Sequence, residues 1–191
     1  DLAWWNGGGC TETMIQGCSN VGSLDAGFNL PLILADTLDD VLTNDAVTFD
    51  DVLNGYFERT RQAIENVLSG MNRYFEARAT YRPQPIRTLL VRDCIDQERD
   101  FNAGGARFNW SVVNIAGLAN VADSLAALRE VLFVQGLVTP TAMREALATD
   151  YRNLEPSRRA LRRCPKFGND LPDVEEMAAH IAGDVYRAIL D

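Results

Sequence analysis

The feature that most constrains this chain is a run of three glycines near its start, followed at once by a thiol and a carboxylate. The stretch reads Gly7-Gly8-Gly9-Cys10-Thr11-Glu12. Glycine has no Cβ, so the run permits backbone conformations that other residues avoid and lets another segment approach closely. In an extended segment, residues two apart point to the same side, which would place Cys10 and Glu12 around one small volume. From the residues alone, a glycine-rich turn with a buried, inert cysteine and a solvated glutamate stays open as the alternative.

The composition indicates a globular chain and argues against two classes of function. The 191 residues are 47% hydrophobic and 24% charged, which is enough to bury a sizeable core. The net charge is −9, and the only basic run is the arginine-rich stretch 158–163, so we expect no nucleic-acid partner. No apolar stretch reaches about 18 residues, so we expect no membrane span.

The cysteines and the single histidine allow a further chemical alternative. Cys10, Cys18, Cys94 and Cys164 lack the spacing of a zinc site, so we expect no bound metal. In a chain this long and apolar, reduced thiols in a cytoplasm are a better expectation than a disulfide framework. His180 falls in the last predicted helix, and a protease-like pair of Cys10 and His180 is the less favoured alternative.

Helical periodicity dominates the rest of the chain. Pro31 suits a first helical turn, and Thr48 with Asp51 resembles a capping box that opens a long amphipathic helix over 49–79. A helix over 118–133 buries apolar residues at spacings of three and four. Further helices are expected after Pro140 (near 143–151), after Pro156, and from Asp170 and Pro172 onward.

Two segments between the helices predict extended structure. Thr88–Val91 is predicted to be a short buried strand. The glycines at 104–105 predict a tight turn that feeds a strand over the residues that follow.

Four segments, in the same order, resemble the glycyl radical enzyme superfamily, the pyruvate formate-lyase-like proteins. The first, Gly9-Cys10-Thr11-Glu12, resembles their Gly-Cys-x-Glu signature. The others are Phe101-Asn102-Ala103-Gly104-Gly105-Ala106-Arg107-Phe108-Asn109, the helix that begins Gly117-Leu118-Ala119-Asn120, and Pro165-Lys166-Phe167-Gly168-Asn169-Asp170. In the last, Phe167 replaces the tyrosine of the family's Pro-Lys-Tyr-Gly-Asn-Asp loop.

The resemblance implies an α/β fold, the second half of a helix-rich, ten-stranded α/β barrel. In the family, one inner loop carries the catalytic cysteine and an opposed loop carries the radical glycine in an Arg-Val-x-Gly-Tyr-like motif. That motif is absent from these residues, and neither Gly168 nor Gly183 matches it. We therefore expect residues 1–191 to be a single partial domain that lacks the N-terminal half barrel and the radical loop, and to be inert alone.

The resemblance also assigns roles to three residues. Cys10 would relay a hydrogen atom as a thiyl radical, and Glu12 would act as a general base on the substrate. Asp25 resembles a second acidic residue of the dehydratase branch, a proton donor to a leaving hydroxyl; a helix N-cap is its open alternative. We expect no cofactor bound in this chain, the glycyl radical lying on a missing C-terminal glycine and being installed by a radical SAM activating enzyme.

Residues 11 and 12 narrow the implied reaction. Pyruvate formate-lyase uses two adjacent cysteines, whereas Thr11 and Glu12 favour the lyase and dehydratase branch, including diol or hydroxyproline dehydratases, C–N or C–S lyases and arylacetate decarboxylases. The alternatives are pyruvate formate-lyase (formate C-acetyltransferase) and a non-catalytic partial paralogue that serves as an interaction module. The implied partners are a small-molecule substrate, the activating enzyme and, at full length, a second copy in a homodimer.

Overall fold

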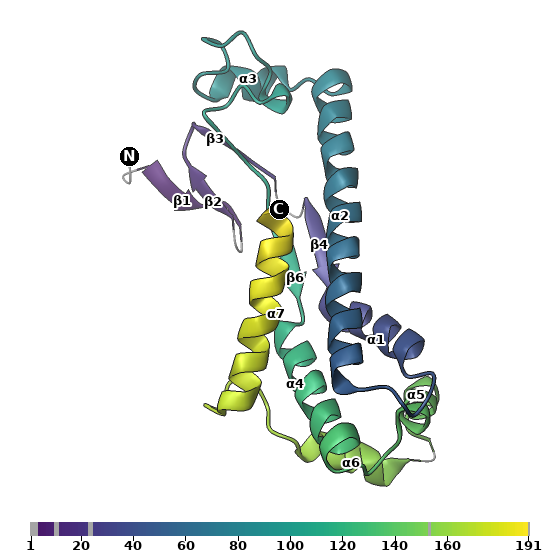
Figure 1. Cartoon of the computed structure of the whole chain (residues 1–191). Helices are drawn as coiled ribbons and strands as arrows, with labels where there is room; N and C mark the ends of the chain where they lie inside the picture. Colours follow the sequence, from purple (N-terminus) through teal and green to yellow (C-terminus); the bar gives the residue numbers. More distant parts are fainter. Residues whose placement is uncertain (1–3, 10–11, 23–24, 153, 191) are drawn as a thin grey trace. The chain divides into compact units, whose positions relative to one another are not determined.

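In the computed structural model the chain forms two compact units, which are described separately below. Figure 1 labels helices and strands of the whole chain. The structure describes residues 4–9, 12–22, 25–152 and 154–190. Unit 1 comprises residues 1–28 and 66–114, and unit 2 comprises residues 29–65 and 115–191. The expectation of one partial domain over 1–191 stays a prediction. No helix in the described part of the chain is long and apolar enough to cross a membrane.

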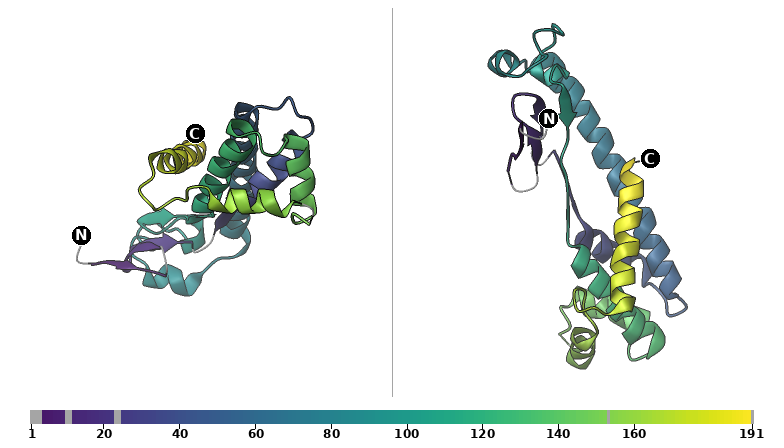
Figure 2. Two further views of the ribbon diagram at one scale, coloured as in Figure 1. Left: turned by 90° about the horizontal axis from the view of Figure 1, so that it is seen from below. Right: turned by 90° about the vertical axis from the view of Figure 1, so that its left-hand side faces the viewer.

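Unit 2 is built almost entirely from helices. They are α1 (Leu30–Val41), the first half of α2 (Phe49–Tyr81), α4 (Leu118–Leu128), the π-helical η3 (Arg129–Val134), α5 (Pro140–Ala148), α6 (Glu155–Arg163) and α7 (Pro172–Leu190). Helix α4 lies along α7 and also packs on α1 (Figures 1 and 2). The predicted helices are therefore confirmed, although α5 ends at Ala148, three residues before the expected end.

The apolar stripes of these helices meet in one core. Its largest fully buried apolar side chains are Leu30, Leu42, Val52, Tyr56, Ile64, Val121, Leu125, Val131, Met143, Val174 and Ile181. Local signals start the helices where the sequence predicts. The Thr48 N–H donates to Asp51 Oδ2 (2.8 Å) and the Asp51 N–H donates to Thr48 Oγ1 (3.2 Å), so the capping box is confirmed.

Unit 1 holds most of the strands. Its elements are β1 (Trp5–Gly7), β2 (Thr13–Ile15), β3 (Ser19–Val21), the second half of α2, α3 (Pro85–Leu90), η2 (Phe101–Ala103) and β5 (Phe108–Trp110). Strands β4 (Ala26–Asn29) and β6 (Val113–Ala116) run through the division between the units. The described strands form three two-stranded sheets, β1–β2, β3–β5 and β4–β6. The glycine turn at 104–105 does feed a strand, β5.

The predicted strand over Thr88–Val91 is wrong, because this segment is helix α3 followed by an extended residue. The carboxylate of Asp100 accepts hydrogen bonds from the Gln84 N–H (2.9 Å) and the Thr88 hydroxyl (2.8 Å), which closes the first turn. Leu89 and Leu90 are 72% and 73% exposed rather than buried. A short run of apolar residues is compatible with either a strand or a helix. Here the hydrogen bonds to the distant Asp100 side chain favour the helix.

We expect Gly117→Ala to destabilise unit 2 more than the matched Gly136→Ala. Both glycines have left-handed backbones, with φ of 87° and 62°, so each alanine pays about 1–2 kcal/mol for that conformation. A Cβ on Gly117 would also overlap the ring of Pro31, whereas a Cβ on Gly136 meets nothing within 4 Å. Urea unfolding followed by circular dichroism measures both losses. Equal losses would show that Pro31 moves aside without cost.

Candidate active site

A tight antiparallel hairpin carries the glycine run. Strand β1 pairs with β2 in the register Trp5–Ile15, Asn6–Met14 and Gly7–Thr13. The Gly8 N–H donates to the Glu12 carbonyl (2.9 Å), just beyond the last pair of this register. Residues 10 and 11 lie outside the described residues, so the shared facing of Cys10 and Glu12 stays a prediction.

The glycines leave room for the side chains that follow the loop. A Cβ on Gly9 would overlap the carboxylate of Glu12, and a Cβ on Gly8 would overlap the thioether of Met14. Glu12 itself is half-buried. The Glu12 carboxylate therefore lies against the backbone of Gly9, the residue that immediately precedes Cys10.

We expect Gly9→Ala to lower activity without unfolding the hairpin. The new methyl group would displace the Glu12 carboxylate, which is the end of a flexible side chain and moves at little energetic cost. Turnover by the complete gene product should fall, while the thermal unfolding midpoint stays close to that of the wild type. The control is Gly17→Ala, where nothing lies within 4 Å and only the backbone, at φ of 68°, is strained. If Gly9→Ala kept full turnover, the position of the Glu12 carboxylate against Gly9 would not matter for catalysis.

The Asp25 carboxylate also lies against the backbone of a glycine, Gly22, three residues earlier in the chain. A Cβ on Gly22 would overlap the carboxylate of Asp25. Oδ2 of Asp25 is fully buried and has no hydrogen-bond partner among the described residues. Asp25 does not cap helix α1, because Asn29 does so by accepting the Leu32 N–H (3.2 Å). The open alternative for Asp25, a helix N-cap, is therefore wrong.

A strand pair supports the segment between the two carboxylates. Strand β3 runs parallel to β5, and Asn20 opposes Asn109. The buried Asn20 amide donates to the Phe101 carbonyl (2.9 Å), and the Gly17 carbonyl accepts the Arg92 N–H (2.8 Å). The Asn20 bond joins the first segment of the chain to the glycine turn at 101–107, and the Gly17 bond joins it to the segment that precedes this turn.

The three described cysteines are free thiols with structural surroundings. Burial, with smaller contributions from Asp100 and Asp93, raises the pKa of Cys94, and burial raises the pKa of Cys164. A raised pKa disfavours the thiolate, so neither is an activated ionic nucleophile. His180 lies in α7 of unit 2, with its ring centroid 4.8 Å from that of Phe57.

The Pro-Lys-Phe-Gly loop is fixed by two carboxylates that the sequence did not single out. The Phe167 N–H donates to Asp123 Oδ1 (2.7 Å), and the Gly168 N–H donates to Glu175 Oε1 (2.8 Å). Asp123 lies in α4 and Glu175 in α7, so the loop ties these two helices together. Asp123 lies in the family-like helix that begins at Gly117, and Glu175 follows the family-like segment 165–170. This position in the sequence was the only signal that could have pointed to them.

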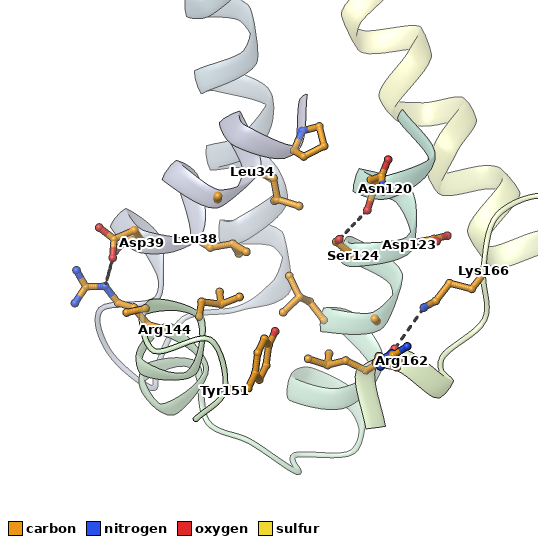
Figure 3. Close-up of a pocket in the computed structure, with 17 residues that line it drawn as sticks. Leu34, Leu38, Asp39, Asn120, Asp123, Ser124, Arg144, Tyr151, Arg162 and Lys166 are labelled. Atoms are coloured by element: carbon orange, nitrogen blue, oxygen red, sulfur yellow. Dashed lines mark hydrogen bonds and ion pairs between the residues drawn. The ribbon is translucent and has the colours of Figure 1, made fainter. Parts of the chain in front are cut away.

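A separate cavity of about 650 Å³ lies in unit 2, between α1, α4, α5 and α6 (Figure 3). The apolar residues that line it include Leu34 and Leu38, and Tyr151 also lines it. Burial raises the pKa of the Tyr151 hydroxyl. Arg144 Nε bonds the carbonyl (2.7 Å) and Oδ1 (3.0 Å) of Asp39, and Lys166 donates to the Leu161 carbonyl. Neither Glu12 nor Asp25 lines this cavity, so it is not the site that the sequence predicts.

Comparison with known proteins places this arrangement in a family. The model of the pyruvate formate lyase-like family matches residues 1–190. The chain belongs to the pyruvate formate lyase-like family. The expected family, and with it an α/β fold of the pyruvate formate-lyase type, is therefore confirmed.

Relatives in this family are similar over different lengths. The chain is 24% identical over 198 residues to trans-4-hydroxy-L-proline dehydratase of Clostridioides difficile, covering 95% of this chain and 25% of that protein. It is 34% identical over 107 residues to YbiW of Escherichia coli (strain K12), a probable dehydratase, covering 54% of this chain and 13% of YbiW. A glycerol-bound B12-independent glycerol dehydratase from Clostridium butyricum superposes with a TM-score of 0.87 at 25% identity, over 97% of this chain and 25% of that one. The chain thus spans a quarter or less of the length of each relative.

Proposed function

We propose that this chain supplies the cysteine loop of a glycyl radical enzyme that eliminates water, or a comparable group, from a small organic substrate. The observation that carries the proposal is the position of the Glu12 carboxylate against Gly9, beside a cysteine in a glycine-rich loop. The three relatives reported above are all dehydratases by name, which supports elimination over acetyl transfer.

The residues present suit the approach of a second, radical-bearing backbone. Gly8 and Gly9 carry no side chains and are exposed, so another loop can come close to the position that precedes Cys10. The Cys10 thiol would give its hydrogen atom to a glycyl radical on such a loop, so that an S–H bond breaks, a glycyl C–H bond forms and a thiyl radical remains on Cys10. Installation of the glycyl radical by a radical SAM enzyme, the homodimer and the cytoplasmic location stay predictions.

Cys10 moves hydrogen atoms in the proposed reaction, whereas Glu12 and Asp25 move protons. The Cys10 sulfur takes a hydrogen atom from a substrate carbon, so a C–H bond breaks and an S–H bond forms. Glu12 accepts the proton of the hydroxyl on that carbon, and Asp25 protonates the neighbouring hydroxyl, which leaves as water. The Cys10 thiol then returns its hydrogen atom to the dehydrated substrate radical. The proton gained by Glu12 and the proton lost by Asp25 balance through solvent.

A direct test uses the complete gene product under anaerobic conditions. The protein is incubated with a radical SAM activating enzyme and S-adenosylmethionine, and its electron paramagnetic resonance spectrum is recorded. It is then supplied separately with glycerol, propane-1,2-diol, trans-4-hydroxy-L-proline, isethionate and indoleacetate. We expect a glycyl doublet and conversion of at least one compound, detected by mass spectrometry as loss of water, sulfite or carbon dioxide.

The same experiment separates the two alternatives. Formation of acetyl-coenzyme A from pyruvate and coenzyme A would favour pyruvate formate-lyase. Absence of both radical and turnover would favour the non-catalytic interaction module. Either result would overturn the proposed elimination.

A further inference from the structure

Strand β6 carries a second buried polar group without a partner, in addition to Asp25, which directly precedes β4. The side-chain nitrogen of Asn114, in β6, is fully buried and has no hydrogen-bond partner among the described residues. The other side-chain atoms of this kind in the described part of the chain lie on helices, on Tyr56, Thr60 and Arg78 of α2 and Asp184 of α7. Buried amides are nearly always hydrogen-bonded, because an unmade bond costs folding free energy. An orphan amide therefore points to a partner that is not part of the described protein.

The register of the two strands places Asn114 near Asp25. The Ala26 N–H donates to the Val112 carbonyl (3.4 Å), and a Cβ on Gly27 would lie 3.8 Å from the Asn114 carbonyl oxygen. These two contacts advance in the same direction along both strands, so the strands run parallel and Gly27 lies opposite Asn114.

The two side chains consequently share one face of the strand pair. Side chains alternate along an extended backbone, and Asp25 directly precedes β4, two residues before Gly27. We infer from this spacing that Asp25 has the same facing as Asn114. Gly27 has no side chain to fill the space between them. One carboxylate oxygen of Asp25 and the amide nitrogen of Asn114, both buried and both without a partner among the described residues, therefore lie on one side of the strand pair in unit 1.

We propose that the Asn114 side-chain amide is a further substrate-binding group, which donates a hydrogen bond to an oxygen of a small hydroxylated substrate whose leaving hydroxyl contacts Asp25. The proposal rests on the proposed function, because it takes Asp25 as the proton donor. An amide donor next to an acid suits a substrate with oxygens on neighbouring carbons, as in a vicinal diol. It does not suit an apolar substrate, which would leave the amide unsatisfied.

The first measurement is the thermal unfolding midpoint of the complete gene product. Asn114→Leu keeps a similar volume and removes an unsatisfied amide, so we expect a midpoint equal to or above that of the wild type. Asn20→Leu is the matched control, because it removes a buried asparagine of β3 whose amide donates to the Phe101 carbonyl. That variant should have a lower midpoint. A fall for Asn114→Leu as large as that for Asn20→Leu would assign Asn114 to the fold and overturn the proposal.

The second measurement is the steady-state kinetics of the activated enzyme on glycerol, propane-1,2-diol and trans-4-hydroxy-L-proline. For any compound that the wild type converts, Asn114→Leu should raise KM about 10-fold with a smaller change in kcat, as expected for a lost binding hydrogen bond. If Asn114→Leu had the same KM and kcat as a wild type that converts the compound, the role of Asn114 would be overturned and the proposed function would stand. A wild type that converts none of the three would contradict the proposed dehydratase, and the role of Asn114 would fall with it.

Discussion

Cys10→Ser is expected to abolish turnover while leaving the protein folded. A thiol S–H bond is close in strength to an activated C–H bond, so sulfur can take a substrate hydrogen and return it. The O–H bond of serine is much stronger, so a glycyl radical cannot take its hydrogen atom and no radical forms at residue 10 to react with the substrate. The measurement is turnover of a converted substrate by the activated complete gene product, with the glycyl signal recorded in parallel.

Two other cysteines serve as controls for Cys10. Cys18 is 5% exposed and packs at the start of β3, so Cys18→Ala should cost some stability but keep most of the turnover per folded protein. Cys164→Ser changes a half-buried thiol whose Sγ donates to the Ala160 carbonyl (3.4 Å) in unit 2. Losses of the same size in all three folded variants would remove the special role of Cys10.

Glu12→Gln is expected to cost about 10²–10⁴-fold in turnover, which is the usual contribution of a general base. The amide is nearly isosteric with the carboxylate, so it can occupy the same place against Gly9, but it cannot accept the substrate proton. Radical content and the thermal midpoint should not change. The rate of the complete gene product and its electron paramagnetic resonance spectrum measure both expectations.

Glu76→Gln is the matched control for this substitution. Glu76 is exposed on α2 in the same unit, and only its backbone carbonyl has a described role, as the acceptor of the Thr80 hydroxyl. It should retain full activity. If Glu12→Gln were equally active on the native substrate, Glu12 would be a structural residue of the hairpin loop.

Much of the fold could be predicted because its signals are local. The apolar spacing over 49–79 and 118–133 determines which faces of those helices are buried, and Thr48 with Asp51 starts α2 through contacts three residues apart. The family resemblance likewise depended on short contiguous motifs. These features need no knowledge of distant residues, since neighbouring turns of one helix bring their groups together.

Other features could not be predicted, because they depend on contacts between residues that are far apart in the sequence. The segment 85–90 became a helix because the distant side chain of Asp100 accepts hydrogen bonds from Gln84 and Thr88 at its start. Asn114 has no motif of its own, and it stands out only because its side-chain nitrogen is buried without a described partner and it lies opposite Gly27. The sequence by itself determined most of the helices and the motif around Cys10, since those signals lie within a few residues of one another. Only the tertiary structure decided which polar groups are buried without partners, because burial is a property of all the segments that pack around an atom.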